Sequence, residues 1–275
     1  MRQRWRGLVV ATGLVLGATT AAVGNPPDGP LKKCPADAVV SGTVCMDKYE
    51  ASVWRVPATN PAGKSNASLV LKVQAGTATE AQLVSGGATP LGVGIEDYAP
   101  CTGNGQTDCG DIYAVSLLGV KPSVFITWFQ AQQACRNARK RLPTNAEWQA
   151  AVAGTPAPAV NNGTTDCDTG FSFPPVASGT GSHSSCVSSA GAFDMVGNVG
   201  EWVADWVPRS TGCGTWSAGV SPTGNLQCLA GAETTGEPGA LIRGGGYGTD
   251  AGPLSVIGYI RPSLQVVDVG FRCAR

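Results

Sequence analysis

The chain has 275 residues, enough for one sizeable domain or two small ones, and it contains 10 cysteines, 38 glycines and 19 prolines. A chain of this length can bury a proper core, so disulfides would reinforce the fold without being its only source of stability. Its 19 basic and 19 acidic residues balance. This balance argues against nucleic acid as the natural partner, because phosphate binding needs a concentrated basic face.

The N-terminal segment has the pattern of a secretory signal peptide. Three arginines within the first six residues give it a positive start, and an apolar run follows from Leu8 to about Val23. A membrane anchor is the alternative, but the run is short and rich in Gly, Ala and Thr, whereas a span needs roughly 20 mostly apolar residues. We predict a signal peptide at residues 1–24, a mature chain with 16 basic and 19 acidic residues, and a secreted or periplasmic location. No other segment is apolar enough to span a membrane.

The cysteine pattern predicts disulfides. No CxxC pair occurs and His183 is the single histidine, which argues against a structural zinc site. An even number of cysteines in an exported chain indicates disulfides. The spacing suggests four local bridges: Cys34–Cys45, Cys101–Cys109, Cys167–Cys186 and Cys213–Cys228. These leave Cys135 and Cys273 as a long-range pair, although spacing alone leaves other connectivities open.

Little regular structure is predicted for the first part of the chain. Residues 34–54 are expected to form a short strand, a turn and a second strand that carries Tyr49 and Glu50. From Pro57 to about Gly110 the composition shifts to Ala, Gly, Thr, Ser and Pro with little periodicity. We interpret 57–110 as a long looped insertion, partly held by Cys101–Cys109.

Two helices are predicted next, each with its own start signal. Thr127 with Gln130 and Thr144 with Glu147 form capping boxes. The first helix, WFQAQQACRNARK, places alanines and Cys135 on one stripe. The second, AEWQAAVAG, is expected to stop at its glycine. Their tryptophans, Trp128 and Trp148, are expected to be core anchors.

Beyond residue 154 the helical pattern fades, and short strands such as EWVADWV, ALIRGG and VGFRCA alternate with long turns. This mixture predicts one irregular, disulfide-rich α+β domain over residues 25–275.

Four ordered motifs carry a resemblance to a known family. WFQAQQACRNARKRLPTNAEWQAA, DMVGNVGEWVADW, LIRGGGY and GFRCAR resemble the segments of the formylglycine-generating enzyme family, also called the sulfatase-modifying factor domain. The similarity covers about residues 40–275, except 57–110. The resemblance implies a C-type-lectin-like fold, often with calcium, and a bridge between Cys135 and Cys273. The best-known members oxidise a cysteine of a sulfatase to formylglycine, with oxygen and a copper ion on two thiols.

The resemblance also implies a calcium site in the stretch DMVGNVGEW. The matching ligands are the side chains of Asp194 and Glu201 and the carbonyls of Gly197 and Val199. Carboxylates and carbonyls are the ligands that calcium prefers, and Gly197 permits the sharp curl that this spacing requires. The alternative is a simple turn whose carboxylates face water. At the position where the family usually has Trp, this chain has Gly200.

The copper site, in contrast, is not expected. Aligned from the shared GG, the two thiol positions of the family fall on Thr249 and Leu254, and neither side chain suits copper. Arg243, Tyr247 and Arg261 are candidates for lining a groove for a peptide or glycan. His183 is expected to be an exposed loop histidine, because no nucleophile-elbow motif accompanies it.

Two functions remain open. The favoured one is an exported, non-catalytic binding protein (a pseudoenzyme) with a structural calcium ion and an unknown protein, peptide or glycan ligand. The alternative is an oxidoreductase of this family that acts on cysteine in sulfatase-like proteins.

Overall fold

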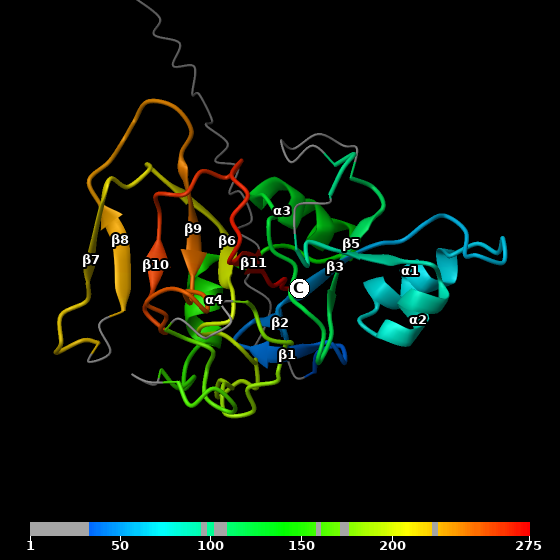
Figure 1. Ribbon diagram of the computed structural model, residues 1–275, viewed down its shortest axis with the longest axis horizontal. Coiled ribbons are helices and arrows are strands. Elements are labelled where there is room, and N and C mark those ends of the chain that lie inside the picture. Colours follow the sequence, from blue (N-terminus) through cyan, green and yellow to red (C-terminus); the bar gives the residue numbers. More distant parts are fainter. Residues whose placement is uncertain (1–32, 95–97, 102–108, 158–160, 171–175, 222–224) are drawn as a thin grey trace, which may run out of the picture.

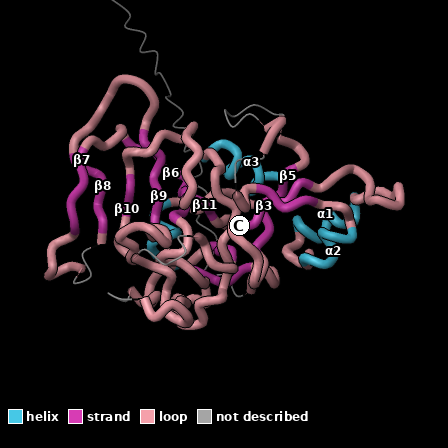
Figure 2. Tube along the Cα trace, viewed as in Figure 1, coloured by secondary structure: helices cyan, strands magenta, loops and turns pink. Residues whose placement is uncertain are grey.

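The computed structural model describes residues 33–94, 98–101, 109–157, 161–170, 176–221 and 225–275. The predicted signal peptide at residues 1–24 lies outside these ranges. Within them, no helix has the length and apolar character needed to cross a membrane. A six-stranded sheet occupies one side of the molecule, and a three-stranded sheet with two short helices occupies the other (Figure 1). Loops and turns make up much of the chain between them (Figure 2).

The larger sheet has the strand order β11-β6-β9-β10-β8-β7. Its strands are β6 (Gly200–Val207), β7 (Gly212–Thr215), β8 (Leu226–Ala230), β9 (Gly239–Arg243), β10 (Val256–Ile257) and β11 (Val269–Phe271). β11 pairs with β6 and β10 with β8 in parallel, and the other neighbours are antiparallel. The three strands predicted in this part of the sequence correspond to β6, β9 and β11.

The N-terminal part forms two smaller sheets. β1 (Ala38–Ser41) pairs with β2 (Val44–Asp47), and β3 (Ala51–Arg55) pairs with β4 (Thr89–Leu91) and β5 (Ile112–Ser116). The prediction of two strands over 34–54 was wrong, because this segment has three. Tyr49 and Glu50 lie in the bend between β2 and β3, where the backbone N–H of Tyr49 donates to Ser116 Oγ at 3.0 Å.

Both predicted helices are present. α3 (Trp128–Asn137) and α4 (Asn145–Ala151) begin at Thr127 and Thr144, and each has the complete reciprocal capping box. The predicted stripe of α3 is fully buried at Ala131, Ala134, Cys135 and Ala138. The turn after α4 ends at Gly154, which has the positive φ of +80° that a helix-ending glycine supplies. Trp148 is a core residue, and Trp128 is half-buried.

The prediction of a looped insertion over 57–110 was wrong for much of that segment. It contains α1 (Ala67–Gln74), α2 (Glu80–Ser85) and β4. α2 starts at a capping box of Thr79 and Gln82, and the two helices bury Leu69, Val73 and Leu83 in a cluster with Trp54 of β3. Helices of 8 and 6 residues are shorter than the window in which helical periodicity becomes visible.

All ten cysteines form disulfides. The pairs are the five predicted ones, Cys34–Cys45, Cys101–Cys109, Cys135–Cys273, Cys167–Cys186 and Cys213–Cys228. Cys135–Cys273 joins α3 to the segment after β11, across 138 residues of sequence. The other four close loops of 8 to 19 residues. Thus only one bridge ties distant parts of the chain together.

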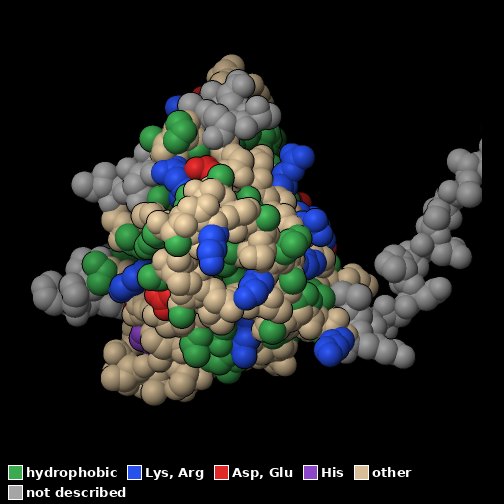
Figure 3. All heavy atoms as spheres, turned by 90° about the vertical axis from the view of Figure 1, so that its right-hand side faces the viewer, with side chains coloured by type: hydrophobic (Ala, Val, Ile, Leu, Met, Phe, Trp, Pro, Cys, Tyr) green, Lys and Arg blue, Asp and Glu red, His purple; other side chains and the backbone are tan. Residues whose placement is uncertain are grey.

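Charge is unevenly distributed over the surface. The face that includes α1 and α2 carries more Lys and Arg than Asp and Glu side chains (Figure 3). These basic side chains are separated by uncharged ones, so they do not form a continuous patch.

Candidate functional site

The glycine turn after β9 shapes the first part of the site. Gly244 and Gly245 have φ values of +82° and +73°. A Cβ on Gly245 would lie 2.6 Å from Cα of Ala251, and one on Gly244 would lie 2.9 Å from the carbonyl oxygen of Met195. The turn therefore requires glycine. It delivers Tyr247 to the loop formed by residues 194–202, which we call the carboxylate loop, where the Tyr247 N–H donates to the carbonyl of Asn198 at 2.9 Å.

A cavity of about 300 Å³ lies beside Tyr247. Its lining residues are Val93, Gly94, Lys121, Pro122, Val124, Phe125, Val176, Ala177, Tyr247 and Val267. Three of the valines, Val93, Val176 and Val267, are more than half exposed. Burial raises the pKa of Tyr247, and the charges of Asp268 and Asp168 raise it further, so its hydroxyl remains a hydrogen-bond donor at neutral pH. The cavity thus combines apolar walls with a phenol and an ammonium group.

Thr249 and Leu254, which align with the copper-binding thiols of the family, do not form a copper site. Thr249 lines a small cavity of about 60 Å³, and its hydroxyl accepts a hydrogen bond from Gly246 N at 2.7 Å. Leu254 instead lies against Asn225 and Trp216, with its N–H bonded to Asn225 Oδ1 and its carbonyl to Trp216 Nε1. Because all ten cysteines are in disulfides, the chain offers no thiol pair. These residues do not fit a copper ion.

The three predicted groove residues do not lie together on one surface. Arg243 is 5% exposed, and its guanidinium stacks 4.7 Å from the ring centre of Trp148. Burial lowers the pKa of Arg243 to about 10. Arg261 is exposed in a turn, whereas Tyr247 lines the cavity. Of the three, only Tyr247 lines the cavity beside the glycine turn.

The stretch DMVGNVGEW forms a tightly curled, buried loop. Asp194, Gly197 and Asn198 all have positive φ, at 56°, 77° and 55°. A Cβ on Gly197 would lie 2.2 Å from the carbonyl oxygen of Asp168, which also accepts a hydrogen bond from Asn198 N at 2.8 Å. The glycine is required because the loop packs directly on the backbone around Asp168. The alternative prediction, a turn with water-facing carboxylates, was wrong: Asp194 and Glu201 are 3% and 1% exposed.

A buried ion pair fixes the end of this loop. Glu201 accepts hydrogen bonds from Arg272, with Nη2–Oε1 at 2.6 Å and Nε at 2.9 Å from both oxygens. Trp148 Nε1 donates to the same carboxylate at 2.6 Å. Arg272 is wholly buried. A bidentate, fully hydrogen-bonded geometry of this kind is what makes a buried ion pair tolerable.

A third carboxylate, Glu50, completes the cluster. It accepts hydrogen bonds from the side-chain amide of Asn198 and from Val199 N, the latter at 3.1 Å. Burial raises the pKa of Glu50 well above its usual value, and the charges of Asp194 and Glu201 raise it further, against the charge of Arg272. The sequence did not reveal this role, because Glu50 is almost 150 residues from the loop that it holds.

The pKa of Asp194 is raised as well. Burial raises its pKa to about 6, and the charge of Glu201 adds to this, whereas the hydrogen bond from Gly181 N and the charges of Arg272 and His183 oppose it. Three buried carboxylates (Glu50, Asp194 and Glu201) therefore face one guanidinium. Such an excess of acidic groups favours either protonation or the binding of a cation.

Three of the four predicted calcium ligands have oxygens that the buried ion pair with Arg272 does not occupy. The buried carbonyls of Gly197 and Val199 accept no hydrogen bond from any group in the described ranges. The carboxylate of Asp194 lies in the same loop and is bonded through Oδ2 to Gly181 N at 2.6 Å. Buried carbonyls of this kind normally have a partner, and calcium accepts carbonyl and carboxylate oxygens. Glu201 is the exception, because Arg272 and Trp148 already occupy its oxygens.

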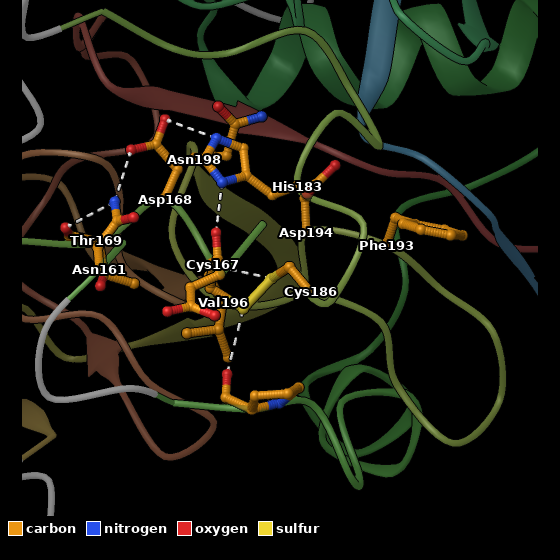
Figure 4. Close-up of a disulfide and its surroundings, with 12 residues drawn as sticks. Asn161, Cys167, Asp168, Thr169, His183, Cys186, Phe193, Asp194, Val196 and Asn198 are labelled. Carbon is orange, nitrogen blue, oxygen red and sulfur yellow. Dashed lines mark hydrogen bonds and ion pairs between the residues drawn. A yellow bond between two sulfur atoms is a disulfide. The ribbon is translucent and has the colours of Figure 1, made fainter. Parts of the chain in front are cut away.

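The structure also corrects the expectation for His183, which is buried and not exposed. Its Nδ1 contacts the carbonyl of Asp166, and its Nε2 lies 3.1 Å from Ser178 Oγ and 3.9 Å from the carboxylate of Asp168. Figure 4 shows the ring beside Asp168 and near the Cys167–Cys186 disulfide. His183 lies within the segment that the Cys167–Cys186 disulfide closes, and its burial results from contacts with Asp166 and Ser178 in that closed segment.

Residues 95–275 match the model of the family described as the Sulfatase-modifying factor enzyme 1-like domain, and the chain belongs to this family. The predicted family and its irregular, disulfide-rich α+β fold are confirmed. The match begins at residue 95, after α1, α2 and β4, so these elements of the insertion lie outside it.

Individual relatives are more distant. The serine/threonine-protein kinase pkn1 of Chlamydia pneumoniae is 34% identical over 97 residues, which are 31% of this chain and 14% of that protein. The solved structure of the Major Tropism Determinant U1 variant has a TM-score of 0.46 and 17% identity, over 90% of this chain and 54% of that one. PvdO from Pseudomonas aeruginosa has a TM-score of 0.40 and 19% identity, over 90% and 88%. The chain thus spans about one seventh of the curated relative and about half of the tropism determinant.

Proposed function

We propose that this protein is an exported, non-catalytic binding member of its family. The observation that carries the proposal is the state of the cysteines: all ten are paired, and Thr249 and Leu254 stand where the oxidases of the family would hold copper. An oxidoreductase acting on cysteine is the alternative, and it would need a redox centre built from other residues. Five disulfides in one chain support export, since such bonds persist in oxidising compartments.

The cavity beside Tyr247 is the proposed ligand site. Its volume of about 300 Å³ is at the lower end of the range for small-ligand pockets. Exposed valines on its rim favour an apolar side chain of a protein or peptide over a glycan, which would need more polar partners. The Tyr247 hydroxyl and the Lys121 ammonium supply the few polar contacts that would orient such a ligand.

A structural calcium ion is proposed in the carboxylate loop. Asp194 and the carbonyls of Gly197 and Val199 would hold it, while the carboxylate of Glu201 stays bonded to Arg272 and Trp148. When bound, the ion would neutralise part of the buried negative charge and satisfy two carbonyls that lack hydrogen bonds. The ion would therefore stabilise the folded protein and fix the conformation of the loop.

The proposal that the protein lacks oxidase activity can be tested with purified protein, Cu(I), oxygen and a Cys-x-Pro-x-Arg peptide. We expect no conversion of the cysteine to an aldehyde by mass spectrometry, because no thiol pair is available to hold the metal. A reaction without added copper is the control. Copper-dependent aldehyde formation would overturn the non-catalytic proposal in favour of the oxidoreductase.

Binding in the cavity can be tested with the fluorescent probe 1-anilinonaphthalene-8-sulfonate, which is apolar and carries one negative charge. We expect saturable binding that Val176→Asp or Val267→Asp weakens about tenfold, since each places a carboxylate in an apolar wall. Val84→Asp on α2 is the matched control, because Val84 is 59% exposed and does not line the cavity. Equal probe binding by all three variants would contradict the proposal that this cavity is the ligand site.

A further inference from the structure

A second groove lies at the end of β6, away from the cavity beside Tyr247. The end of the strand forms one wall and the loop before β9 forms the other, enclosing about 410 Å³. Its lining residues are Trp206, Val207, Pro208, Glu233, Thr234, Gly236, Glu237 and Pro238. None of them belongs to the site described above.

Trp206 is exposed and yet held in place. Its ring lies 4.9 Å from that of Trp128 and 5.8 Å from that of Phe129, with interplanar angles of 67° and 85°. Trp128 is itself anchored, because its Nε1 donates to the carbonyl of Val203 at 2.8 Å. Nevertheless 43% of Trp206 remains exposed. A large aromatic ring fixed by its neighbours gives a ligand contact area at a small cost in conformational entropy.

The groove also carries a negative charge. Glu233 forms an ion pair with Arg209 and is thereby neutralised. Glu237 accepts a hydrogen bond from Ser263 Oγ at 2.5 Å, but no cationic group of the described chain forms an ion pair with it. The groove lined by Trp206 therefore contains one exposed carboxylate without a counter-charge, which disfavours phosphate-bearing ligands and favours a cation.

We propose that this groove binds a proline-rich segment of a protein partner that carries a basic residue. Proline-rich segments are already extended before they bind, and they dock into aromatic-lined grooves with little loss of entropy. Trp206, flanked by Pro208 and Pro238, offers the apolar surface for the proline rings. Glu237 offers the charge for an Arg or Lys side chain, which can also lie over the indole face.

Calorimetry with the peptide acetyl-Pro-Pro-Arg-Pro-Pro-amide tests this proposal. We expect saturable binding that Trp206→Ala weakens about tenfold or more, the equivalent of about 1.4 kcal/mol. Glu237→Gln should weaken binding of this peptide several-fold and leave binding of the version with Gln in place of Arg unchanged. Tyr259→Ala is the matched control, because Tyr259 has the same exposed fraction of 43% and lies outside the groove.

Three results would overturn the proposal. The first is no binding by the wild-type protein at millimolar peptide, and the second is wild-type binding of the arginine peptide by both Trp206→Ala and Glu237→Gln. A third is saturable binding of a neutral glycan such as laminarihexaose that depends on Trp206 while the peptides fail to bind. Because Glu237 is exposed, Glu237→Gln keeps the test valid even if Trp206→Ala disturbs folding.

Discussion

Arg272 supplies the positive charge on which the carboxylate loop depends. Besides its bonds to Glu201, its guanidinium donates to the carbonyl of Asp47 at 3.1 Å and to that of Phe193 at 2.8 Å. One side chain thus joins β2, the start of the loop and β6 at a point closed to water. Removing either partner of such a pair leaves a buried charge without compensation.

We expect Arg272→Met to lower the free energy of unfolding by about 3–5 kcal/mol, measured by urea denaturation. Arg141→Met is the matched control, because the Arg141–Glu147 pair is partly exposed and such pairs contribute about 0–1 kcal/mol. Equal losses in the two variants would contradict the role assigned to Arg272.

At the scale of elements, the Cys135–Cys273 bridge connects α3 with the end of β11 and completes the core between the two larger sheets. Both cysteines belong to the same buried cluster as Trp202 and Phe271. The bridge closes a loop of 138 residues, whereas Cys101–Cys109 closes one of 8. The stabilisation by a disulfide grows with the length of the loop that it closes, if the effect is entropic.

We therefore expect removal of the long bridge, by Cys135→Ala with Cys273→Ala, to lower the free energy of unfolding by about 5 kcal/mol. Removal of Cys101–Cys109 in the same way should cost about 2–3 kcal/mol. Urea denaturation under non-reducing conditions gives both values. A larger loss from the short bridge would show that packing, and not loop closure, determines the effect.

At the scale of the whole molecule, calcium should change the stability of the fold as one unit. A ligand that binds only the folded state stabilises it by about 2.7 kcal/mol at 100 times its dissociation constant. For a chain of this size, that corresponds to a rise of about 5–10 °C in the thermal midpoint. The rise should disappear with chelator.

Asp194→Asn should remove most of this rise, because it takes away the one carboxylate of the loop that is not engaged by Arg272. Glu80→Gln, a change to an exposed carboxylate on α2, should retain it. Differential scanning calorimetry with and without calcium gives the comparison. If calcium leaves the midpoint of the wild type unchanged, Arg272 and protonation alone compensate the buried negative charge of the loop.

The sequence by itself determined the features that depend on neighbouring residues. The capping boxes at Thr127 and Thr144 are complete within four residues, and the four short disulfides join the nearest cysteines. The ordered motifs around α3, β6, β9 and β11 identified the family. Such signals survive in a linear sequence because their hydrogen bonds or covalent links are local.

Only the tertiary structure decided which charges are buried and what surrounds them. Glu50 bonds to Val199 across 149 residues, and Arg272 bonds to Glu201 across 71. Arg243 was predicted to line a groove but stacks on Trp148. The physical reason is that the free energy of a buried charge depends on partners that folding brings together from distant segments, and no local pattern records those partners.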